Sequence, residues 1–241
     1  MELVQCKVGN ASFRMVVSNP WERFRVETLA SKEPETVRWI LDNFRDGDTL
    51  LDVGANVGIY AILAAAYNRA GTVVAVEPMA ATFARLCENS VHNELQNFRP
   101  YCLAIGAENG LTTLNLTSLD AASSMHSVGD SGVFEEPVVL TAGISVVTLD
   151  TLAATAGVPN LIKIDVDGGE DAVLAGAANV LRDPRLRSVL VEFNWTDGND
   201  GPHYRDEPLV SAGFRREAVG IEYAREAIRW QNTIYSRPPL L

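Results

Sequence analysis

The sequence predicts an α/β fold built on a doubly wound, mainly parallel sheet with helices on both faces. An apolar run at residues 50–53 leads into a glycine turn at residues 54–58, and apolar residues with helical spacing follow. A second apolar run, at residues 73–76, ends in Glu77, about 20 residues beyond the turn. Because strands and helices alternate in this way through most of the chain, parallel strands joined by crossover helices are the expected topology.

The segment before these strands, residues 1–45, is expected to form an extension packed on a main domain of residues 46–241. Mixed apolar and polar residues at 3–17 predict a small hairpin, and the spacing of apolar residues at 33–44 predicts a helix. Such an extension either lies over a ligand cleft or forms an additional layer on the sheet, and the sequence leaves both options open.

The elements expected after Glu77 continue the alternation. In order they are a helix at 78–92, strands at 98–103 and 111–116, two short β pieces within 138–149, a helix from Leu149, a strand at 161–164, a helix at 168–181, a strand at 187–193, a short helix at 206–212, and strands at 214–219 and 228–236. The last two strands are expected to pair antiparallel. The polar segment at 118–136, which contains His126, is typical of a lid or binding loop. Asp150 or Thr151 is the expected N-cap of the helix from Leu149.

The glycine turn and the acid that follows it predict a nucleoside-containing cofactor. Dinucleotide sites usually show G-x-G-x-x-G, whereas Gly54 and Gly58 are spaced G-x-x-x-G with Asp52 just ahead. An acid beside the turn suits an ammonium group, and Glu77 at the next strand end suits two ribose hydroxyls. These features favour S-adenosylmethionine. A nicotinamide dinucleotide and a turn that serves only helix–strand packing are the alternatives.

Composition limits the partners that the protein can take. With 20 Lys and Arg against 31 Asp and Glu, the formal net charge is −11, and the sequence has no basic block. Nucleic acid and anionic membranes are therefore not expected partners, because both are bound by clustered cations. Cys6, Cys87 and Cys102 form no disulfide or metal-binding pattern. With no signal peptide and no apolar run of about 20 residues, a cytoplasmic protein is expected.

Five short motifs resemble one family when taken together. They are D-V-G-A-N-V-G from Asp52 to Gly58, V-E-P from Val76 to Pro78, L-D-x-L from Leu149 to Leu152, I-K-I-D-V-D-G-G-E from Ile162 to Glu170, and V-E-F from Val191 to Phe193. In this order they resemble the FkbM-type, class I S-adenosylmethionine-dependent methyltransferases. The resemblance implies a seven-stranded Rossmann-like sheet with an antiparallel C-terminal strand. It also implies methyl transfer, commonly to a hydroxyl of a sugar or natural product. Asp167 departs from the pattern, since the family more often has Glu there.

The resemblance assigns cofactor contacts by position. These residues are Asp52, Gly54, Asn56, Gly58 and Glu77, with Tyr60, Met79 and Ile105 as candidates for packing against the cofactor and Asp165 as a further contact. The acceptor is expected to be a small molecule, and a homo-oligomer is left open.

Acids at two neighbouring strand ends are the candidates for catalysis. An alcohol must lose a proton to accept a methyl group, and a general base or a metal can arrange this. Asp165 and Glu192 are therefore the expected catalytic carboxylates, and with Asn194 they offer oxygen ligands that suit Mg²⁺. The competing interpretation is that Asp165 and Asp167 hydrogen-bond helix N–H groups and the cofactor.

Two other side chains carry hypotheses of their own. His203 lies in a glycine-rich loop after the Glu192 strand and is a general-base candidate, with an ordinary surface histidine as the alternative. Lys163 is expected to pair structurally with an acid. O-methylation is the leading prediction for the reaction. N- or C-methylation, a nicotinamide-dependent dehydrogenase and a non-catalytic cofactor-binding protein are the alternatives.

Overall fold

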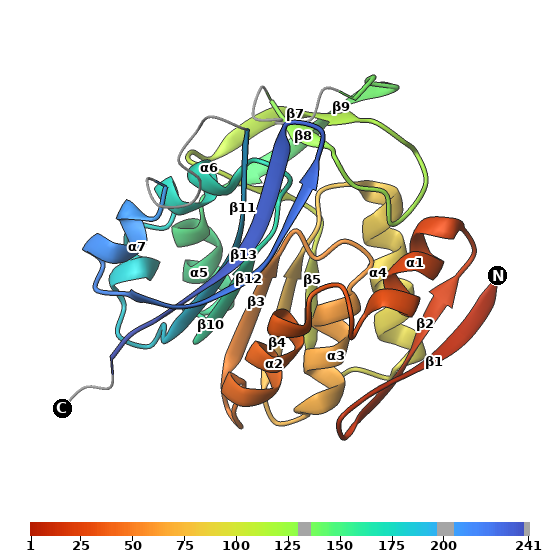
Figure 1. Ribbon diagram of the computed structural model, residues 1–241, viewed down its shortest axis with the longest axis horizontal. Coiled ribbons are helices and arrows are strands. Elements are labelled where there is room, and N and C mark those ends of the chain that lie inside the picture. Colours follow the sequence, from red (N-terminus) through yellow and green to blue (C-terminus); the bar gives the residue numbers. More distant parts are fainter. Residues whose placement is uncertain (130–135, 197–204, 239–241) are drawn as a thin grey trace.

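The computed structural model describes residues 1–129, 136–196 and 205–238, and its centre is a sheet of seven strands (Figure 1). In order across the sheet they are β12 (Arg215–Arg225), β13 (Ile228–Ser236), β11 (Ser188–Thr196), β10 (Leu161–Ile164), β3 (Thr49–Val53), β4 (Thr72–Val76) and β5 (Phe98–Tyr101). The five strands from β11 to β5 are parallel, and β13 is antiparallel to both of its neighbours. The predicted topology is confirmed, including the antiparallel pairing of the last two strands.

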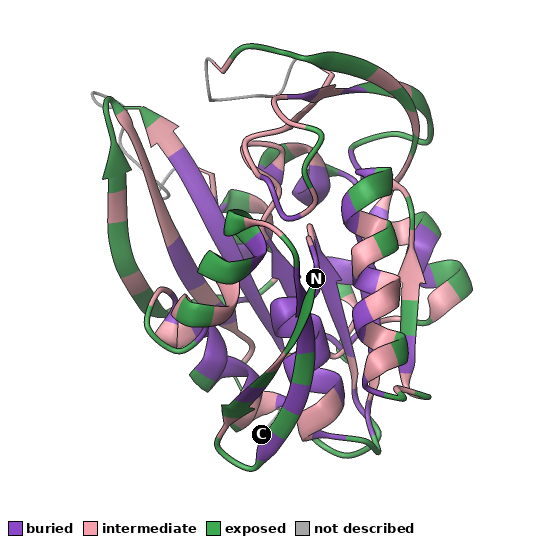
Figure 2. Cartoon of the chain, turned by 90° about the vertical axis from the view of Figure 1, so that its right-hand side faces the viewer, coloured by how far each residue is buried: buried purple, intermediate pink, exposed green. Residues whose placement is uncertain are grey.

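Alternating apolar side chains on the central strands face two helical layers. Leu50 packs in a core with α2 (Pro34–Asn43), α3 (Ile59–Tyr67) and α4 (Ala80–His92). Leu51 packs on the opposite face in a core with α5, α6 and α7, which are described below. This alternation follows from the two-residue period of a strand and makes the sheet doubly wound. The central strands are accordingly buried, whereas the outer strand carries many exposed residues (Figure 2).

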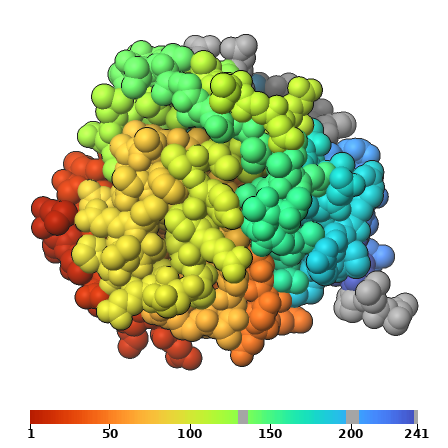
Figure 3. Space-filling model, turned by 180° about the vertical axis from the view of Figure 1, so that it is seen from behind, coloured from red at the N-terminus to blue at the C-terminus, as the bar shows by residue number. Residues whose placement is uncertain are grey.

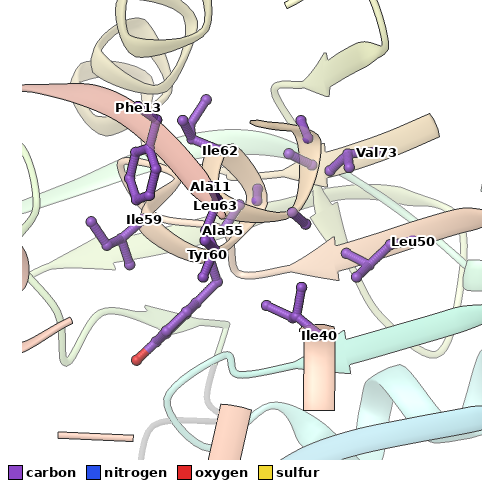
Figure 4. Packing of buried hydrophobic residues seen from close by; sticks show 14 of the residues in the cluster. Ala11, Phe13, Ile40, Leu50, Ala55, Ile59, Tyr60, Ile62, Leu63 and Val73 are labelled. Atoms are coloured by element: carbon purple, nitrogen blue, oxygen red, sulfur yellow. The ribbon is translucent and has the colours of Figure 1, made fainter. Parts of the chain in front are cut away.

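The chain begins with the predicted hairpin. Strands β1 (Glu2–Val8) and β2 (Ala11–Val17) pair antiparallel, and β2 lies against α3 and α4. Phe13 of β2 contributes to the same core as Ile59 and Ile62 of α3 (Figure 4). The hairpin is thus an additional layer outside the helices. In the view from behind, this N-terminal segment, in red, and part of the chain that follows β11, in blue, lie at opposite edges of the molecule (Figure 3).

Helix α1 (Pro20–Thr28) is an element that the sequence pattern did not predict. Asn19 and Glu22 form a capping box at its start, in which each side chain accepts a hydrogen bond from the backbone N–H of the other residue. The helix has no apolar stripe, because Trp21 and Phe24 are exposed while Glu22 is buried. Hydrophobic periodicity therefore gave no signal for it.

Four strands form a separate small sheet over one end of the main one. They are β6 (Ala104–Ile105), β9 (Leu140–Val147), β7 (Gly110–Leu116) and β8 (Ser127–Val128), in that order. Two expectations are corrected here. The third core strand ends at Tyr101, and the two β pieces expected within 138–149 are one continuous strand, because β9 pairs along the full length of β7.

The second helical layer holds two further corrections. Helix α5 (Leu149–Ala156) is capped by Thr148, whose Oγ1 accepts from the Thr151 N–H at 3.0 Å. Asp150 instead accepts the backbone N–H groups of Asn179 and Val180, at the start of a short 3₁₀ turn. The helix expected at 168–181 is divided into α6 (Glu170–Ala175) and this 3₁₀ turn (Val180–Arg182).

Gly176 ends α6 because it lies against another backbone. A Cβ on Gly176 would be 2.1 Å from the carbonyl oxygen of Gly106. The layer is completed by α7 (Glu207–Ser211). Across the part of the chain that the structure describes, every helix is too short or too polar to cross a membrane.

Candidate cofactor and catalytic site

A cavity of about 540 Å³ opens at the carboxyl ends of the parallel strands. Its lining includes residues that follow β3, β4 and β10, and Glu192 and Asn194 within β11. Helix α1 and the segment at 123–128 contribute other walls, and Arg225 and Trp230 come from the C-terminal hairpin. Ligands of doubly wound folds bind at this edge. The predicted residues among its lining are Gly54, Asn56, Tyr60, Glu77, Met79, Ile105, Asp165, Glu192 and Asn194.

The glycine turn is fixed by backbone contacts. Gly54 has a φ of +80°, and a Cβ on it would lie 1.8 Å from the carbonyl oxygen of Asp165. The N–H groups of Gly54 and Ala55 both donate to the Val76 carbonyl, at 3.0 and 2.9 Å. Only glycine fits this close approach. Gly58 lies outside the cavity lining and packs against Leu86, which explains the second glycine by helix packing and not by ligand contact.

Glu77 is held at the cavity wall by the turn itself. Its carboxylate accepts the backbone N–H groups of Asn56 at 3.0 Å and Met79 at 2.9 Å. Burial raises the pKa of Glu77 to about 7, and these two hydrogen bonds oppose that effect. The Asn56 side chain donates in turn to the Ser123 carbonyl at 2.9 Å. An acid fixed at this position can accept hydrogen bonds from ribose hydroxyls.

Asp52 lies beneath the cavity and not in its wall. Lys163 stands between it and Asp165: the Lys163 Nζ is 2.9 Å from Asp165 Oδ2 and 3.7 Å from Asp52 Oδ1. Burial alone would lower the pKa of Lys163, but the charges of Asp165 and Asp52 raise it above its usual value. The expected pairing of Lys163 with an acid is confirmed. Lys163 also lines the cavity, so its ammonium is part of the site.

Three carboxylates meet beside this lysine. Glu33, Asp165 and Glu192 each offer an oxygen atom within 4.8 Å of the other two. Glu33 was not among the predicted site residues, because it precedes α2 in a segment without a motif. Its carboxylate pairs with Lys32 Nζ at 2.5 Å. The cluster therefore joins two strand ends to the N-terminal extension.

The acids of this cluster differ in protonation. Burial, together with the charges of Asp165 and Glu33, raises the pKa of Glu192 well above its ordinary value. For Asp165, burial acts in the same direction, but Lys163 and Lys32 outweigh it and lower the pKa. Asp165 is thus held in its ionised form, and the raised pKa makes Glu192 the stronger base of the two.

Asn194 and Asp167 make contacts other than those expected. The Asn194 Nδ2 donates to Glu170 Oε1 at 3.3 Å, whereas its Oδ1 is buried and has no hydrogen-bond partner among the described residues, so the predicted metal-ligand role of Asn194 stays a prediction. Asp167 accepts the Met125 N–H at 2.7 Å, across the cavity, and not a helix N–H group. Glu170 does accept the Gly168 N–H at the helix start, as the competing interpretation required of that region.

His126 lines the cavity but has no free lone pair. Its Nδ1 accepts the Thr117 backbone N–H at 3.2 Å, which leaves the proton on Nε2 to donate to Ser123 Oγ at 3.0 Å. Burial lowers the pKa of His126 to about 4. The ring is therefore a neutral structural link in the wall. His203, the other histidine hypothesis, lies outside the described residues.

Solved structures of other proteins share this fold. Magnesium protoporphyrin IX methyltransferase (ChlM) from Synechocystis PCC 6803, solved with bound S-adenosylmethionine, superimposes with a TM-score of 0.55 at 11% identity over 92% of this chain and 86% of that chain. Trm5b from Pyrococcus abyssi gives 0.53 at 13% identity over 97% and 55%. At such identities the likeness concerns the fold alone.

The sequence comparison defines the family. The family model described as Methyltransferase FkbM domain matches residues 52–216, more than half of the chain. The chain belongs to the FkbM methyltransferase family. It is 28% identical over 190 residues to the hexuronic acid methyltransferase AglP of Haloferax volcanii, covering 78% of this chain and 73% of that protein. It is 31% identical over 179 residues to the 31-O-demethyl-FK506 methyltransferase FkbM of Streptomyces tacrolimicus, covering 64% and 68%.

Proposed function

We propose that the protein transfers a methyl group from S-adenosylmethionine to a hydroxyl group of a small molecule, a sugar or another natural product. The observation that carries this proposal is the pairing of Glu192, a carboxyl group with a raised pKa, with the Asp165–Lys163 ion pair in the wall of one cavity. The names of the two relatives, one acting on a hexuronic acid and one on an O-demethylated compound, support an oxygen acceptor. The net charge of −11 favours a small molecule over nucleic acid.

The residues of the turn and of the next strand end would hold the cofactor. Glu77 would accept the ribose hydroxyls, and the open backbone at Gly54 would let the cofactor lie against the turn. The cofactor's ammonium group would lie near Asp165, since Asp52 is reached only past Lys163. Met79 and Ile105 supply apolar wall for the adenine. The sulfonium of S-adenosylmethionine supplies the methyl group in an in-line displacement.

Glu192 is the proposed proton acceptor. Within the described part of the chain, no side chain or N–H group donates a hydrogen bond to its carboxylate, so its oxygens are available to an acceptor hydroxyl. Its raised pKa makes it a stronger base than an ordinary carboxylate. Asp165, fixed by Lys163, stays ionised and orients the hydroxyl. By bringing both carboxylates to one wall, the fold aligns the nucleophile with the methyl group, which is a major source of rate in such reactions.

Mg²⁺ on the same cluster is the second candidate arrangement. The spacing of Glu33, Asp165 and Glu192 favours it, because three carboxylate oxygens within reach of one another suit a divalent cation. Lys163 and Lys32 already neutralise Asp165 and Glu33, however, so a metal would compete with two ammonium groups. We therefore favour the metal-independent base. Turnover that is unchanged after thorough chelation supports this choice, and loss of turnover that Mg²⁺ restores favours the metal.

The decisive experiment measures product and binding separately. Turnover of a panel of free and glycosidic hexuronic acids with S-adenosylmethionine should give a product whose new methyl group is on oxygen, as determined by NMR. Glu192→Gln should abolish turnover while S-adenosylhomocysteine still binds, and Glu222→Gln, an exposed change on β12, should be silent. Full activity in Glu192→Gln would remove the base assignment, and methylation on nitrogen or carbon would remove the O-methyltransferase assignment.

The first 45 residues have a proposed part in the same reaction. We infer that they act as an extension of a main domain at residues 46–241, with α1 and Glu33 completing the acceptor side of the cavity. The two options left open by the sequence are thus combined, since the hairpin packs as a layer and α1 reaches the cavity.

A further inference from the structure

Four cationic side chains line the cavity, and three of them already have an acidic partner. Lys163 pairs with Asp165 at 2.9 Å, Lys32 with Glu33 at 2.5 Å, and Arg225 with Glu136 at 2.8 Å. The fourth is Arg25 of α1. Within residues 1–129, 136–196 and 205–238, no carboxylate lies within ion-pair distance of its guanidinium. A cation that lines a ligand cavity without an acidic partner is available to an anionic ligand.

The position of Arg25 is fixed by the structure around it. Its Nε donates to the Ala122 carbonyl at 3.0 Å, which orients the guanidinium and leaves its two terminal nitrogens without a described partner. Helix α1 is itself held firmly, because Glu22 is buried and pairs with Arg85 at 2.9 Å, and because the Asn19 amide donates to the Ala121 carbonyl at 2.9 Å. Arg25 is therefore preorganised and need not be recruited by a ligand.

Electrostatics place this cation over the middle of the site. Burial is the main influence on the pKa of both Glu77 and Asp167, and the charge of Arg25 acts against it in each case. Glu77 follows β4 and Asp167 follows β10, and both line the same cavity as Arg25, so the charge of Arg25 acts on acids from two strand ends. The two terminal nitrogens of a guanidinium match the two oxygens of a carboxylate, which makes arginine the usual partner for that group.

We propose that Arg25 binds a carboxylate of a ligand in this cavity, either the α-carboxylate of S-adenosylmethionine or a carboxylate on the acceptor. The assignment rests on the proposed cofactor site. It gives α1, a helix outside the family's motifs, a direct part in ligand recognition. It also accounts for an arginine in a cavity whose other three cations are paired.

The first arm of the test compares two ligands that differ only in the carboxylate. Calorimetry would measure binding of S-adenosylhomocysteine and of its decarboxylated analogue to wild type, Arg25→Gln and Arg25→Lys. If the cofactor carboxylate is the partner, Arg25→Gln lowers the affinity for S-adenosylhomocysteine about 10- to 100-fold and leaves the analogue unchanged, and Arg25→Lys recovers part of the loss. A merely structural role, through the Ala122 contact, would weaken both ligands equally and would exclude the cofactor carboxylate as the partner of Arg25.

The second arm addresses the acceptor. D-glucuronate and D-glucose would be titrated into protein saturated with S-adenosylhomocysteine, and binding of glucuronate that depends on Arg25 supports the acceptor carboxylate. Arg23→Gln, on the same helix but paired with Glu2 at the surface, is the matched control and should change neither arm. Equal loss in the first arm, or no change in it, combined with no Arg25-dependent glucuronate binding, overturns the proposal. Failure of wild type to bind either adenosyl ligand would instead refute the cofactor site itself.

Discussion

The two sides of the cavity are built in different ways. The side that we propose for the cofactor comes from turns that directly follow adjacent parallel strands, and its contacts are largely backbone contacts, such as those of Gly54 and Glu77. The side that we propose for the acceptor comes from segments far apart in the sequence, α1 and the C-terminal hairpin, and it presents large side chains. Trp21 and Phe24 of α1 line the cavity while 42% and 52% exposed. Short runs of sequence therefore determine the first side, whereas tertiary contacts between distant segments form the second.

This difference has a functional meaning. A site whose shape depends on backbone groups tolerates few changes of sequence. Such a site suits a ligand that is common to a whole family. A wall that contains the exposed Trp21 and Phe24 and the half-buried Trp230, which stacks on Tyr223 with ring centroids 5.9 Å apart, can change without disturbing the sheet. Changes on the cofactor side should therefore alter cofactor binding and stability together, and changes on the acceptor side should alter acceptor binding alone.

The largest expected effect is at Gly54. Gly54→Ala would place a methyl group 1.8 Å from the Asp165 carbonyl oxygen, so the turn must move. We expect at least about 3 kcal/mol of lost stability and no measurable binding of S-adenosylhomocysteine, measured by thermal unfolding and calorimetry. Gly47→Ala is the control, because Gly47 has the same φ of +80° with open space around it. It should lose about 1 kcal/mol and keep its binding. Equal effects at the two positions would show that backbone strain, and not close approach, explains Gly54.

A smaller effect, dependent on pH, is expected at Glu77. Its pKa is raised to about 7, mainly by burial, and ribose hydroxyls donate to the ionised form. The affinity for S-adenosylhomocysteine should therefore increase as the pH rises through about 7 and level off above it. Without ligand the sign is reversed: burial of the neutral form contributes stability that is fully present below about pH 4.5 and is lost as the pH rises to about 7. Glu77→Gln should bind roughly tenfold more weakly above pH 7, with no such pH dependence. A pH profile shared by wild type and variant would contradict this role.

On the acceptor side, a change at Trp230 tests whether acceptor binding can be altered without altering cofactor binding. Trp230→Ala removes the stacked partner of Tyr223 and part of the cavity wall. The KM for the acceptor should rise about fivefold to tenfold, while the affinity for S-adenosylhomocysteine stays within a factor of two. Ile221→Ala, an exposed change on the adjacent strand outside the cavity lining, should affect neither quantity. A fall in cofactor affinity for Trp230→Ala would show that the two sides are not separable.

The smallest expected effect concerns His126 and stability alone. Burial lowers the pKa of His126 to about 4, against an ordinary value of 6.5. Between these two pH values the imidazole is protonated in the unfolded chain and neutral in the folded chain. Stability should therefore fall as the pH drops from about 6.5 towards 4. His126→Gln should flatten this part of the profile of Tm against pH. His92→Gln, at the partly exposed end of α4, should leave the slope as in wild type. An unchanged slope in His126→Gln would assign the acid sensitivity to other groups.

The sequence could predict the cofactor side because each of its signals is local. The glycine turn, Glu77 and the strand ending at Asp165 are runs of a few residues whose physical requirements are visible without tertiary contacts. The sheet order followed from the same alternation of strands and helices. What the motifs did not indicate was that Asp52 would be separated from the cavity by Lys163, since that depends on which side chains of neighbouring strands face one another.

The acceptor side could not be predicted in the same way. Helix α1 has no apolar stripe, and its only local signal was the capping box of Asn19 and Glu22. Glu33 reaches Asp165 and Glu192 through the packing of α2, for which the sequence has no motif. Thr148, and not Asp150, caps α5, because the Asp150 carboxylate accepts the backbone N–H groups of Asn179 and Val180 instead. In each case tertiary contacts, which the local sequence does not show, determined which structure or which hydrogen-bond partner was adopted.

Strand β13 lies between β11 and β12, although it follows both in the chain. During synthesis the ribosome therefore releases an open β11 edge and a β12 segment that has no neighbour in the sheet. Both are completed when β13 emerges and inserts between them. The bare edge is a target for intermolecular pairing until then. Since Trp230 is carried by this same strand, a nascent chain becomes protected from aggregation and complete as an acceptor site in one late event.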